Sequence, residues 1–186
     1  VYNAMVGGWE PGYYDRTYAV GIDPAGPGRD AFVAVIVDVT SRPYRLVAMH
    51  RAATRTTEYN LGRVLEMLEE YSPSFIAVEK NGLGAPILEA IQSLRPALRV
   101  EAVTTTAQSK VTNTDRLVLL LERGELLLPP DDIFRSEFLG FKQDENGRRA
   151  ADTGCSDDIV MALAHLFAIH KDPEVRETAS SWYSLL

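Results

Sequence analysis

The sequence predicts an α/β fold in which a mixed central sheet carries helices on both faces. Short apolar runs that are rich in β-branched residues and bounded by Gly and Pro indicate strands, whereas longer segments with apolar residues at helical spacing indicate helices. Three strands come first, and helices then alternate with strands. This order joins an antiparallel hairpin edge to a parallel α/β portion.

The antiparallel part is predicted for residues 18–52. The runs YAVGIDP (18–24) and AFVAVIVDV (31–39) flank the Gly/Pro-rich segment PAGPGRD, which favours a hairpin between them. The run YRLVAMHRA (44–52) supplies a third strand.

The later elements follow from helical periodicity and from stop signals. The spacing of Leu61, Val64 and Leu68 indicates a helix that Pro73 terminates. The expected elements are a helix over 58–71, a strand over 74–79, a helix over 85–94, a strand over 98–105, a helix over 110–123, a short extended piece and a turn over 126–134, a hairpin within 138–152 around Glu145-Asn146-Gly147-Arg148, and a helix over 157–170.

Length and composition are those of one globular domain. The chain has 186 residues, of which 46% are hydrophobic and 24% charged, so it can bury a core. We expect this domain over residues 17–170, with a linker or arm over 1–16 and a tail over 171–186. No apolar run approaches the roughly 20 residues of a membrane span, and the N-terminus does not resemble a signal peptide. The absence of an initiator Met suggests an excised domain.

Cysteine content and net charge limit the chemistry. Cys155 is the only cysteine, so an intramolecular disulfide is impossible, a cysteine-based zinc site is not expected, and a reducing, intracellular setting is inferred. The formal net charge of −7 argues weakly against a nucleic-acid partner, because Lys and Arg normally bind the phosphates. Acids grouped to bind metal lower the net charge locally, however, and basic residues can still line one face.

Four acids stand at the ends of predicted elements. Asp23 ends the first strand and Glu79 ends the strand SFIAVE. Asp157 and Asp158 open the last helix, after Ser156 as its expected N-cap. Each acid alone has an ordinary structural explanation, as a turn cap, a salt-bridge partner or a complement to the helix dipole. Together they can converge on one point, where carboxylate oxygens suit hard cations such as Mg²⁺.

These segments resemble a known family. The combination of GIDPAG, VEKNGLG and SDDIVMALAHL, with SKVTNTDRLVLLLERGELLLP between the second and the third, is similar to the C-terminal nuclease domain of the large terminase subunit of tailed bacteriophages. The resemblance covers residues 17–170 and implies a ribonuclease H-like fold. It also implies a metal-dependent endonuclease that cuts concatemeric double-stranded DNA by two-metal-ion hydrolysis.

The resemblance implies a site and its cofactors. The four acids Asp23, Glu79, Asp157 and Asp158 would hold two Mg²⁺ or Mn²⁺ ions, with Asp23 bridging both. Asp158 would be the principal ligand of the helix pair, and Asp157 an auxiliary ligand or the holder of a water or a basic side chain. Many relatives place a His before the paired acids, where this chain has Ser156, so no His is expected to act there.

Partners also follow from the resemblance. The family's large subunit carries an N-terminal ATPase domain, and this sequence contains no GxxxxGK[ST], so that domain is expected to lie outside it. Double-stranded DNA, the portal and the small terminase subunit are the other expected partners. The place of action would be the host cytoplasm, without a membrane.

Basic and amide side chains near the acids are candidate DNA contacts, although a solvated helix face explains some of them equally well. The candidates are Lys80, Lys110, Asn113, Arg116, Arg148 and Arg149. The histidines are separate from the acids in the sequence pattern, so His50, His165 and His170 are expected to be structural.

Other functions remain open at this stage. A Holliday-junction resolvase or a transposase-like nuclease of the same fold would use the same acids on another DNA shape. An actin-like sugar kinase or ATPase shares the Gly-Ile-Asp strand, but it needs a duplicated fold with two phosphate loops, and this sequence has one copy. A non-catalytic module that docks on the portal would not need the acids.

Overall fold

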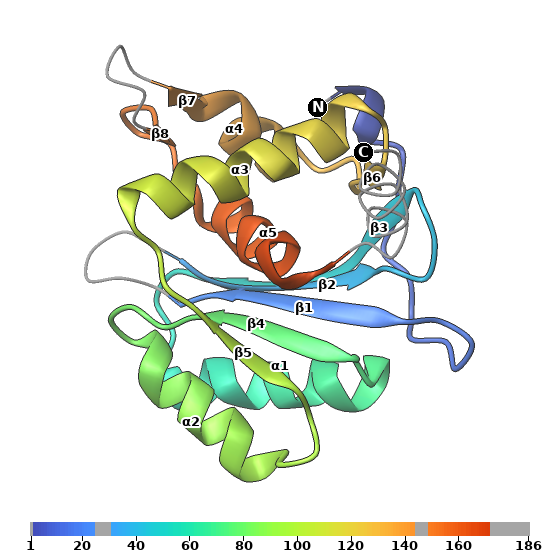
Figure 1. The fold of residues 1–186 in the computed structure, drawn as a ribbon, viewed down its shortest axis with the longest axis vertical. Coiled ribbons are helices and arrows are strands. Elements are labelled where there is room, and N and C mark those ends of the chain that lie inside the picture. The colour runs from blue at the N-terminus through green and yellow to red at the C-terminus, as the bar shows by residue number, and fades with distance from the viewer. Residues whose placement is uncertain (1, 25–30, 144–148, 172–186) are drawn as a thin grey trace, which may run out of the picture.

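The computed structural model describes residues 2–24, 31–143 and 149–171, which form a sheet between two layers of helices (Figure 1). The main sheet contains β1 (Tyr18–Asp23), β2 (Phe32–Asp38), β3 (Tyr44–Ala52), β4 (Phe75–Glu79), β5 (Val100–Val103) and β6 (Leu126–Leu127), in the order β5-β4-β1-β2-β3-β6. The helices are α1 (Thr57–Tyr71), α2 (Gly84–Leu94), α3 (Ala107–Glu122), α4 (Asp132–Gly140) and α5 (Asp158–Ile169). A small hairpin joins β7 (Phe141–Gln143) to β8 (Arg149–Ala151).

The predicted mixed α/β class is confirmed. β2 lies antiparallel between β1 and β3, whereas β4 lies parallel to β1, and β5 parallel to β4. Helices α1 and α2 cover one face of the sheet, and α3, α4 and α5 lie on the other (Figure 1). All seven residues of β2 are buried, which explains its uninterrupted apolar run. No helix in the described ranges is long and apolar enough to cross a bilayer.

Side chains along β1 and β4 alternate between two hydrophobic cores. The core on the α1–α2 side takes Tyr18, Val20, Ile22, Ile76 and Val78. The core on the α5 side takes Ala19, Phe75 and Ala77. Because successive residues of a strand face opposite ways, the last residues of these strands, Asp23 and Glu79, are directed to the α5 side.

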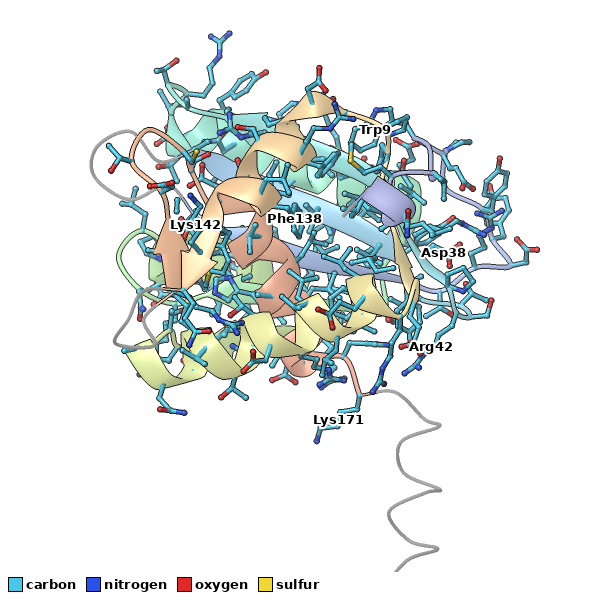
Figure 2. The ribbon with its side chains drawn as sticks, turned by 90° about the horizontal axis from the view of Figure 1, so that it is seen from above. Trp9, Asp38, Arg42, Phe138, Lys142 and Lys171 are labelled. Atoms are coloured by element: carbon cyan, nitrogen blue, oxygen red, sulfur yellow. The ribbon has the colours of Figure 1, made fainter. Side chains whose placement is uncertain are left out.

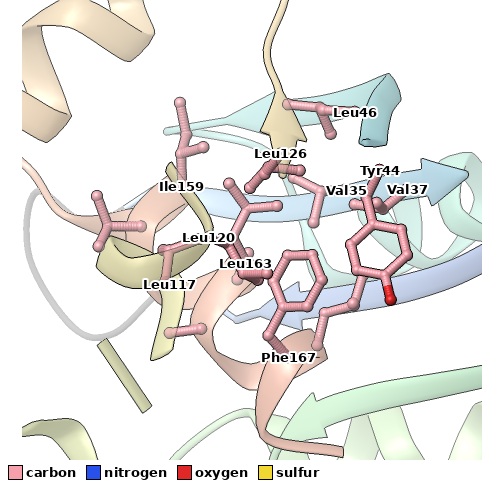
Figure 3. Packing of buried hydrophobic residues seen from close by; sticks show 14 of the residues in the cluster. Val35, Val37, Tyr44, Leu46, Leu117, Leu120, Leu126, Ile159, Leu163 and Phe167 are labelled. Carbon is pink, nitrogen blue, oxygen red and sulfur yellow. The ribbon is translucent and has the colours of Figure 1, made fainter. Parts of the chain in front are cut away.

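Helix α5 approaches β1 unusually closely at Gly21. A Cβ atom at Gly21 would lie 2.1 Å from the carbonyl oxygen of Ala162, so only glycine allows the observed packing. Leu163 and Phe167 of α5 then fill the core between the sheet and α3, which contributes residues such as Leu120 (Figure 3). The last helix is thereby fixed over the centre of the sheet.

The first turn of α5 receives its cap from another helix. The N-cap of α5 is Asp157 and not the expected Ser156. The Asp157 side chain accepts no hydrogen bond from the first turn of the helix. Instead, Oε2 of Glu137 in α4 accepts a hydrogen bond from the Ile159 amide at 2.8 Å, and Oε1 accepts one from the Ser156 hydroxyl at 2.8 Å. Glu137 is 2% exposed, so a buried carboxylate fixes where α5 begins.

Helix α4 itself differs from the sequence prediction, which has only an extended piece and a turn over 126–134. Asp131 caps the helix, because its carboxylate accepts a hydrogen bond from the Ile133 amide at 3.0 Å. Phe134 is buried and Ile133 and Phe138 pack against the core, but the other buried positions, Glu137 and Gly140, interrupt the apolar pattern of the helix. The predicted hairpin follows at β7 and β8, and its tip, with the Asn146-Gly147 signal, lies outside the described residues.

The two edges of the main sheet have different backbone neighbours. Beyond β6, residues of the N-terminal arm bond to the backbone: the Leu128 carbonyl accepts from Gly7, and the Leu128 amide donates to Ala4. At the other edge β5 has four residues and, within the described ranges, pairs only with β4. In the view of Figure 2, Trp9 of the arm lies toward the upper right and Lys142 of β7 toward the left.

Gly21→Ala is expected to lower the free energy of unfolding by about 1–3 kcal/mol or more, because the added methyl group collides with the Ala162 carbonyl. Gly62→Ala in α1 is the matched control, since a Cβ there meets nothing within 4 Å and helix propensity predicts a gain of about 1 kcal/mol. Urea unfolding followed by circular dichroism measures both changes. Equal stability of Gly21→Ala and the wild type would contradict the close contact.

Glu137→Gln is expected to destabilise the protein by about 1–3 kcal/mol. Each carboxylate oxygen of Glu137 accepts one hydrogen bond, from Ser156 or from Ile159, and the side-chain amide of Gln has only one oxygen. Glu66→Gln is the control, because the Glu66 side chain is 64% exposed and its ion pair with Arg63 lies on the surface of α1. The same unfolding measurement compares them. A loss no larger than that of the control would show that Glu137 does not secure α5.

Candidate metal centre

Strand register brings Asp23 and Glu79 together. β1 and β4 run parallel with Ile22 opposite Val78. The next residues, Asp23 and Glu79, therefore lie side by side at the carboxyl ends of the two strands. Neighbouring strands are about 4.8 Å apart, and both side chains are directed to the α5 face. Two acids that are far apart in the sequence therefore meet where parallel sheets commonly bind ligands.

Glu79 is held by the turn that follows it. Oε1 accepts a hydrogen bond from the Asn81 side-chain amide at 3.3 Å, and the same amide group donates to the Thr105 carbonyl at 3.0 Å. A Cβ at Gly84 would lie 1.6 Å from the Glu79 carbonyl oxygen, so the turn into α2 requires glycine. Asn81 and Gly84 thus fix the acid with respect to the loop after β5.

Asp23 lies in an environment that opposes its negative charge. It is 9% exposed. Its pKa is raised well above the ordinary value of 3.8, first by burial, then by a hydrogen bond and repulsion with Glu79, and then by the charges of Asp158 and Asp157. Ionisation of Asp23 is therefore less favourable than that of an ordinary exposed carboxyl group.

Asp158 and Asp157 point to different partners, as expected for consecutive residues at a helix start. Oδ2 of the buried Asp158 accepts a hydrogen bond from the Ala31 amide at 3.1 Å and lies 3.4 Å from Nη2 of Arg51. Oδ2 of Asp157 lies 2.7 Å from Nζ of Lys110 in α3. Asp158 is thus turned toward β2 and β3, and Asp157 toward α3.

Arg51 connects Asp158 to the cap of α5. Its Nη2 also lies 3.3 Å from Oε1 of Glu137 and 3.2 Å from the Ser156 hydroxyl. Sequence reasoning missed Arg51 and Glu137, because both reach their partners across elements distant in the chain and neither belongs to a recognisable pattern.

His165 lies beside the acids, although the sequence pattern separates it from them. One of its ring nitrogens is within 4.8 Å of carboxylate oxygens of Asp23 and Glu79, which also lie within 4.8 Å of each other. The side chain is fully buried, and its Nε2 lies 3.0 Å from the Thr105 hydroxyl. The spacing of seven residues from Asp158 could have indicated this position, because it places both residues on one side of α5.

Two of the predicted DNA contacts lie along α3 and hold opposite ends of α5. Lys110 pairs with Asp157 and lies 5.6 Å from the centroid of the Phe141 ring in β7. Arg116 donates to the His170 carbonyl at 2.6 Å, at the end of α5. Both side chains therefore have partners within the protein.

The remaining candidates differ in exposure. Arg149 donates to the Thr114 hydroxyl at 3.0 Å and also pairs with Asp115, so it joins β8 to α3. Lys80 is exposed directly after Glu79, and Asn113 is half-buried. Arg148 lies outside the described residues.

Comparison with known proteins identifies a family and a fold. The family described as the terminase RNaseH-like domain matches residues 20–168. No curated protein matches the chain.

Several solved structures share the fold. The large terminase nuclease of the thermophilic phage G20c with bound magnesium matches with a TM-score of 0.74 at 22% identity, over 87% of this chain and 86% of that one. The large terminase nuclease domain of bacteriophage SPP1 with bound Mn matches with a TM-score of 0.56 at 14% identity, over 82% and 85%. A longer structure, the large terminase of another thermophilic bacteriophage, matches with a TM-score of 0.65 at 11% identity, over 82% of this chain and 40% of that chain.

These likenesses confirm the predicted ribonuclease H-like fold, in which antiparallel and parallel strands share one sheet between helical layers. The family match extends from β1 into the last turns of α5 and so includes every acid of the site. The chain therefore belongs to the terminase RNaseH-like domain family.

Proposed function

We propose that this domain is a metal-dependent endonuclease of a viral DNA-packaging motor, which cuts concatemeric double-stranded DNA. The observation that carries the proposal is the pairing of Asp23 with Glu79 at the ends of parallel strands, where burial and mutual repulsion raise the pKa of Asp23. Membership of the terminase family supports the nuclease role. The structures of the G20c and SPP1 nucleases with bound magnesium and Mn support the choice of cofactor.

The residues present suit hard divalent cations. Asp23 and Glu79 offer carboxylate oxygens, and among the described residues no Lys or Arg forms an ion pair with either. A bound cation would offset the cost of ionising Asp23. We propose that Asp23, Glu79, Asp157 and Asp158 hold two Mg²⁺ or Mn²⁺ ions, with Asp23 shared between them.

The chain's own residues would orient these ligands. When bound, such ions activate a water and stabilise the leaving oxygen of a phosphodiester. The Ala31 amide and Arg51 fix the carboxylate of Asp158, and Asn81 fixes that of Glu79. Lys110 neutralises Asp157 and can transfer to a DNA phosphate, because its side chain is 24% exposed.

DNA would approach the carboxyl ends of β1 and β4, where the acids lie. We propose Lys80 and Lys110 as the nearest phosphate contacts, because the first follows Glu79 and the second pairs with Asp157. The other proposed contacts are Asn113, Arg116, Arg148 and Arg149. Arg116 and Arg149 must break their hydrogen bonds to His170 and Thr114, respectively, before they can bind DNA phosphates.

The domain would work as part of a larger assembly. We propose residues 17–170 as the nuclease domain, with an arm before it and a tail after it. The match covers 40% of the longer large terminase structure, which supports an N-terminal ATPase domain as a partner within the same subunit. The portal and the small terminase subunit are the further proposed partners, and the host cytoplasm is the proposed place of action.

Cleavage of supercoiled plasmid tests the proposal. The chain is expected to nick and linearise the plasmid with Mg²⁺ or Mn²⁺ but not with EDTA. Asp23→Asn and Asp158→Asn are expected to lower the rate at least about a hundredfold, because each removes a proposed ligand. Asp132→Asn is the control, since this acid of α4 has a 93% exposed side chain and is expected to retain full activity.

The outcomes separate the nuclease from other functions. Metal-dependent cleavage that survives both ligand variants would place the activity elsewhere. Absence of cleavage by folded protein with every metal would contradict a nuclease that acts alone and favour a docking role or dependence on the ATPase domain. Preferential cleavage of four-way junctions would favour a resolvase.

Asp23→Asn is expected to stabilise the metal-free protein at neutral pH. The pKa of Asp23 in the folded protein is raised well above 3.8, so its contribution to stability is complete below that value and is lost as the pH rises through the folded pKa. Asn stays neutral, and its advantage therefore grows with pH. Thermal unfolding in EDTA, from below the ordinary pKa to neutral pH, measures this difference, with Asp132→Asn as the control. A difference that does not change with pH would contradict the raised pKa.

A further inference from the structure

His165 is difficult to explain as a packing residue. It is fully buried, yet its Nδ1 has no hydrogen-bond partner among the described residues. The backbone of Ile22 raises the pKa of His165, but it forms no hydrogen bond to Nδ1. A buried polar atom without a partner costs about 1–3 kcal/mol, which an apolar side chain would avoid.

The contact with Thr105 leaves Nδ1 of the His165 ring free to act as a ligand atom. Nε2 lies 3.0 Å from the Thr105 hydroxyl, whose oxygen can accept a hydrogen bond from an Nε2–H group. With the proton on Nε2, the lone pair of the neutral ring is on Nδ1. Burial, followed in size by an opposing effect of Glu79, lowers the pKa of His165, so the neutral ring is the favoured form.

The same loop holds two members of the cluster. The Thr105 hydroxyl contacts His165, and the Thr105 carbonyl accepts from Asn81, which also donates to Glu79. A histidine whose second nitrogen is bonded to a neighbouring group is the usual arrangement around a protein-bound metal. The loop after β5 therefore provides an outer layer for the acids and the imidazole together.

We propose that His165 is a nitrogen ligand of the cation held by Asp23 and Glu79, with Thr105 as the residue that positions its ring. This inference rests on the proposed function, because it needs that metal site. Donor atoms about 2.0–2.2 Å from one ion are at most about 4.4 Å apart. One ligand atom from each of the three side chains lies within 4.8 Å of the other two, which is close to that separation.

A nitrogen ligand changes which metals bind. Imidazole suits Zn²⁺ and the later first-row metals, among which Co²⁺ lies between Fe²⁺ and Ni²⁺ in affinity, whereas Mg²⁺ and Mn²⁺ suit oxygen ligands. We therefore expect this chain to bind Co²⁺ more tightly than Mg²⁺. Replacement of His165 should reduce this preference, not metal binding in general.

Metal titration of the 186-residue chain tests this expectation without measuring cleavage. Co²⁺ binding is followed by visible absorption, and Mg²⁺ binding by competition. His165→Gln is expected to weaken Co²⁺ binding at least about tenfold and Mg²⁺ binding less. Thr105→Val should give a smaller loss, which Thr105→Ser restores. His50→Gln is the matched control, because His50 bonds to Asn60 on the other side of the sheet and should leave both affinities unchanged.

The outcomes distinguish the histidine from the metal site itself. Unchanged Co²⁺ affinity and spectrum in His165→Gln, with binding abolished in Asp23→Asn, would overturn the role of His165 and leave the proposed metal site intact. Retention of metal binding by Asp23→Asn would overturn the site. If His165→Gln does not fold, ¹⁵N spectra of the wild type with Zn²⁺ decide: a shift of one ring nitrogen of the buried histidine supports ligation, and its absence refutes it.

Discussion

The contact between Gly21 and the backbone of α5 is the constraint on which the site depends. A side chain at this position would separate helix and sheet, since a Cβ would already lie 2.1 Å from the Ala162 carbonyl. With glycine, α5 lies directly over β1, and residues on its inner side come within reach of the strand ends. Asp158 and His165 stand four residues before and three residues after Ala162, which places all three on that side.

The acids of the site fall into two electrostatic groups. Asp158 and Asp157 have basic partners from the protein, Arg51 and Lys110 respectively. Asp23 and Glu79 form no ion pair with a Lys or Arg of the described residues, and burial, followed in size by the effect of Glu79, raises the pKa of Asp23. Basic side chains of the protein thus lie beside Asp157 and Asp158, whereas the charge of Asp23 and Glu79 is left to the proposed cations. This division agrees with a cation site in a chain whose net charge is −7.

The strands and the acids at their ends could be predicted because those signals are local. The apolar runs before Asp23 and Glu79 show where each strand ends, but only the register of β1 with β4 shows that the two acids meet. The role of Glu137 could not be predicted, because its partner Ile159 is 22 residues away and belongs to another helix. The position of His165 beside the acids could not be predicted for a different reason. It stands within the most apolar of the described helices, where the sequence alone does not show that Thr105 and Glu79 lie beside it.

The arm that bonds to Leu128 also has a consequence for association between molecules. An unpaired strand edge offers amide and carbonyl groups to any other chain, and a central sheet as apolar as this one would be a template for aggregation. The arm occupies those groups beyond β6. At the other edge β5 is short, and Arg99 and Glu101 form an ion pair along it, so charged side chains discourage the addition of a further strand. Growth of the sheet is thus restrained at both of its edges.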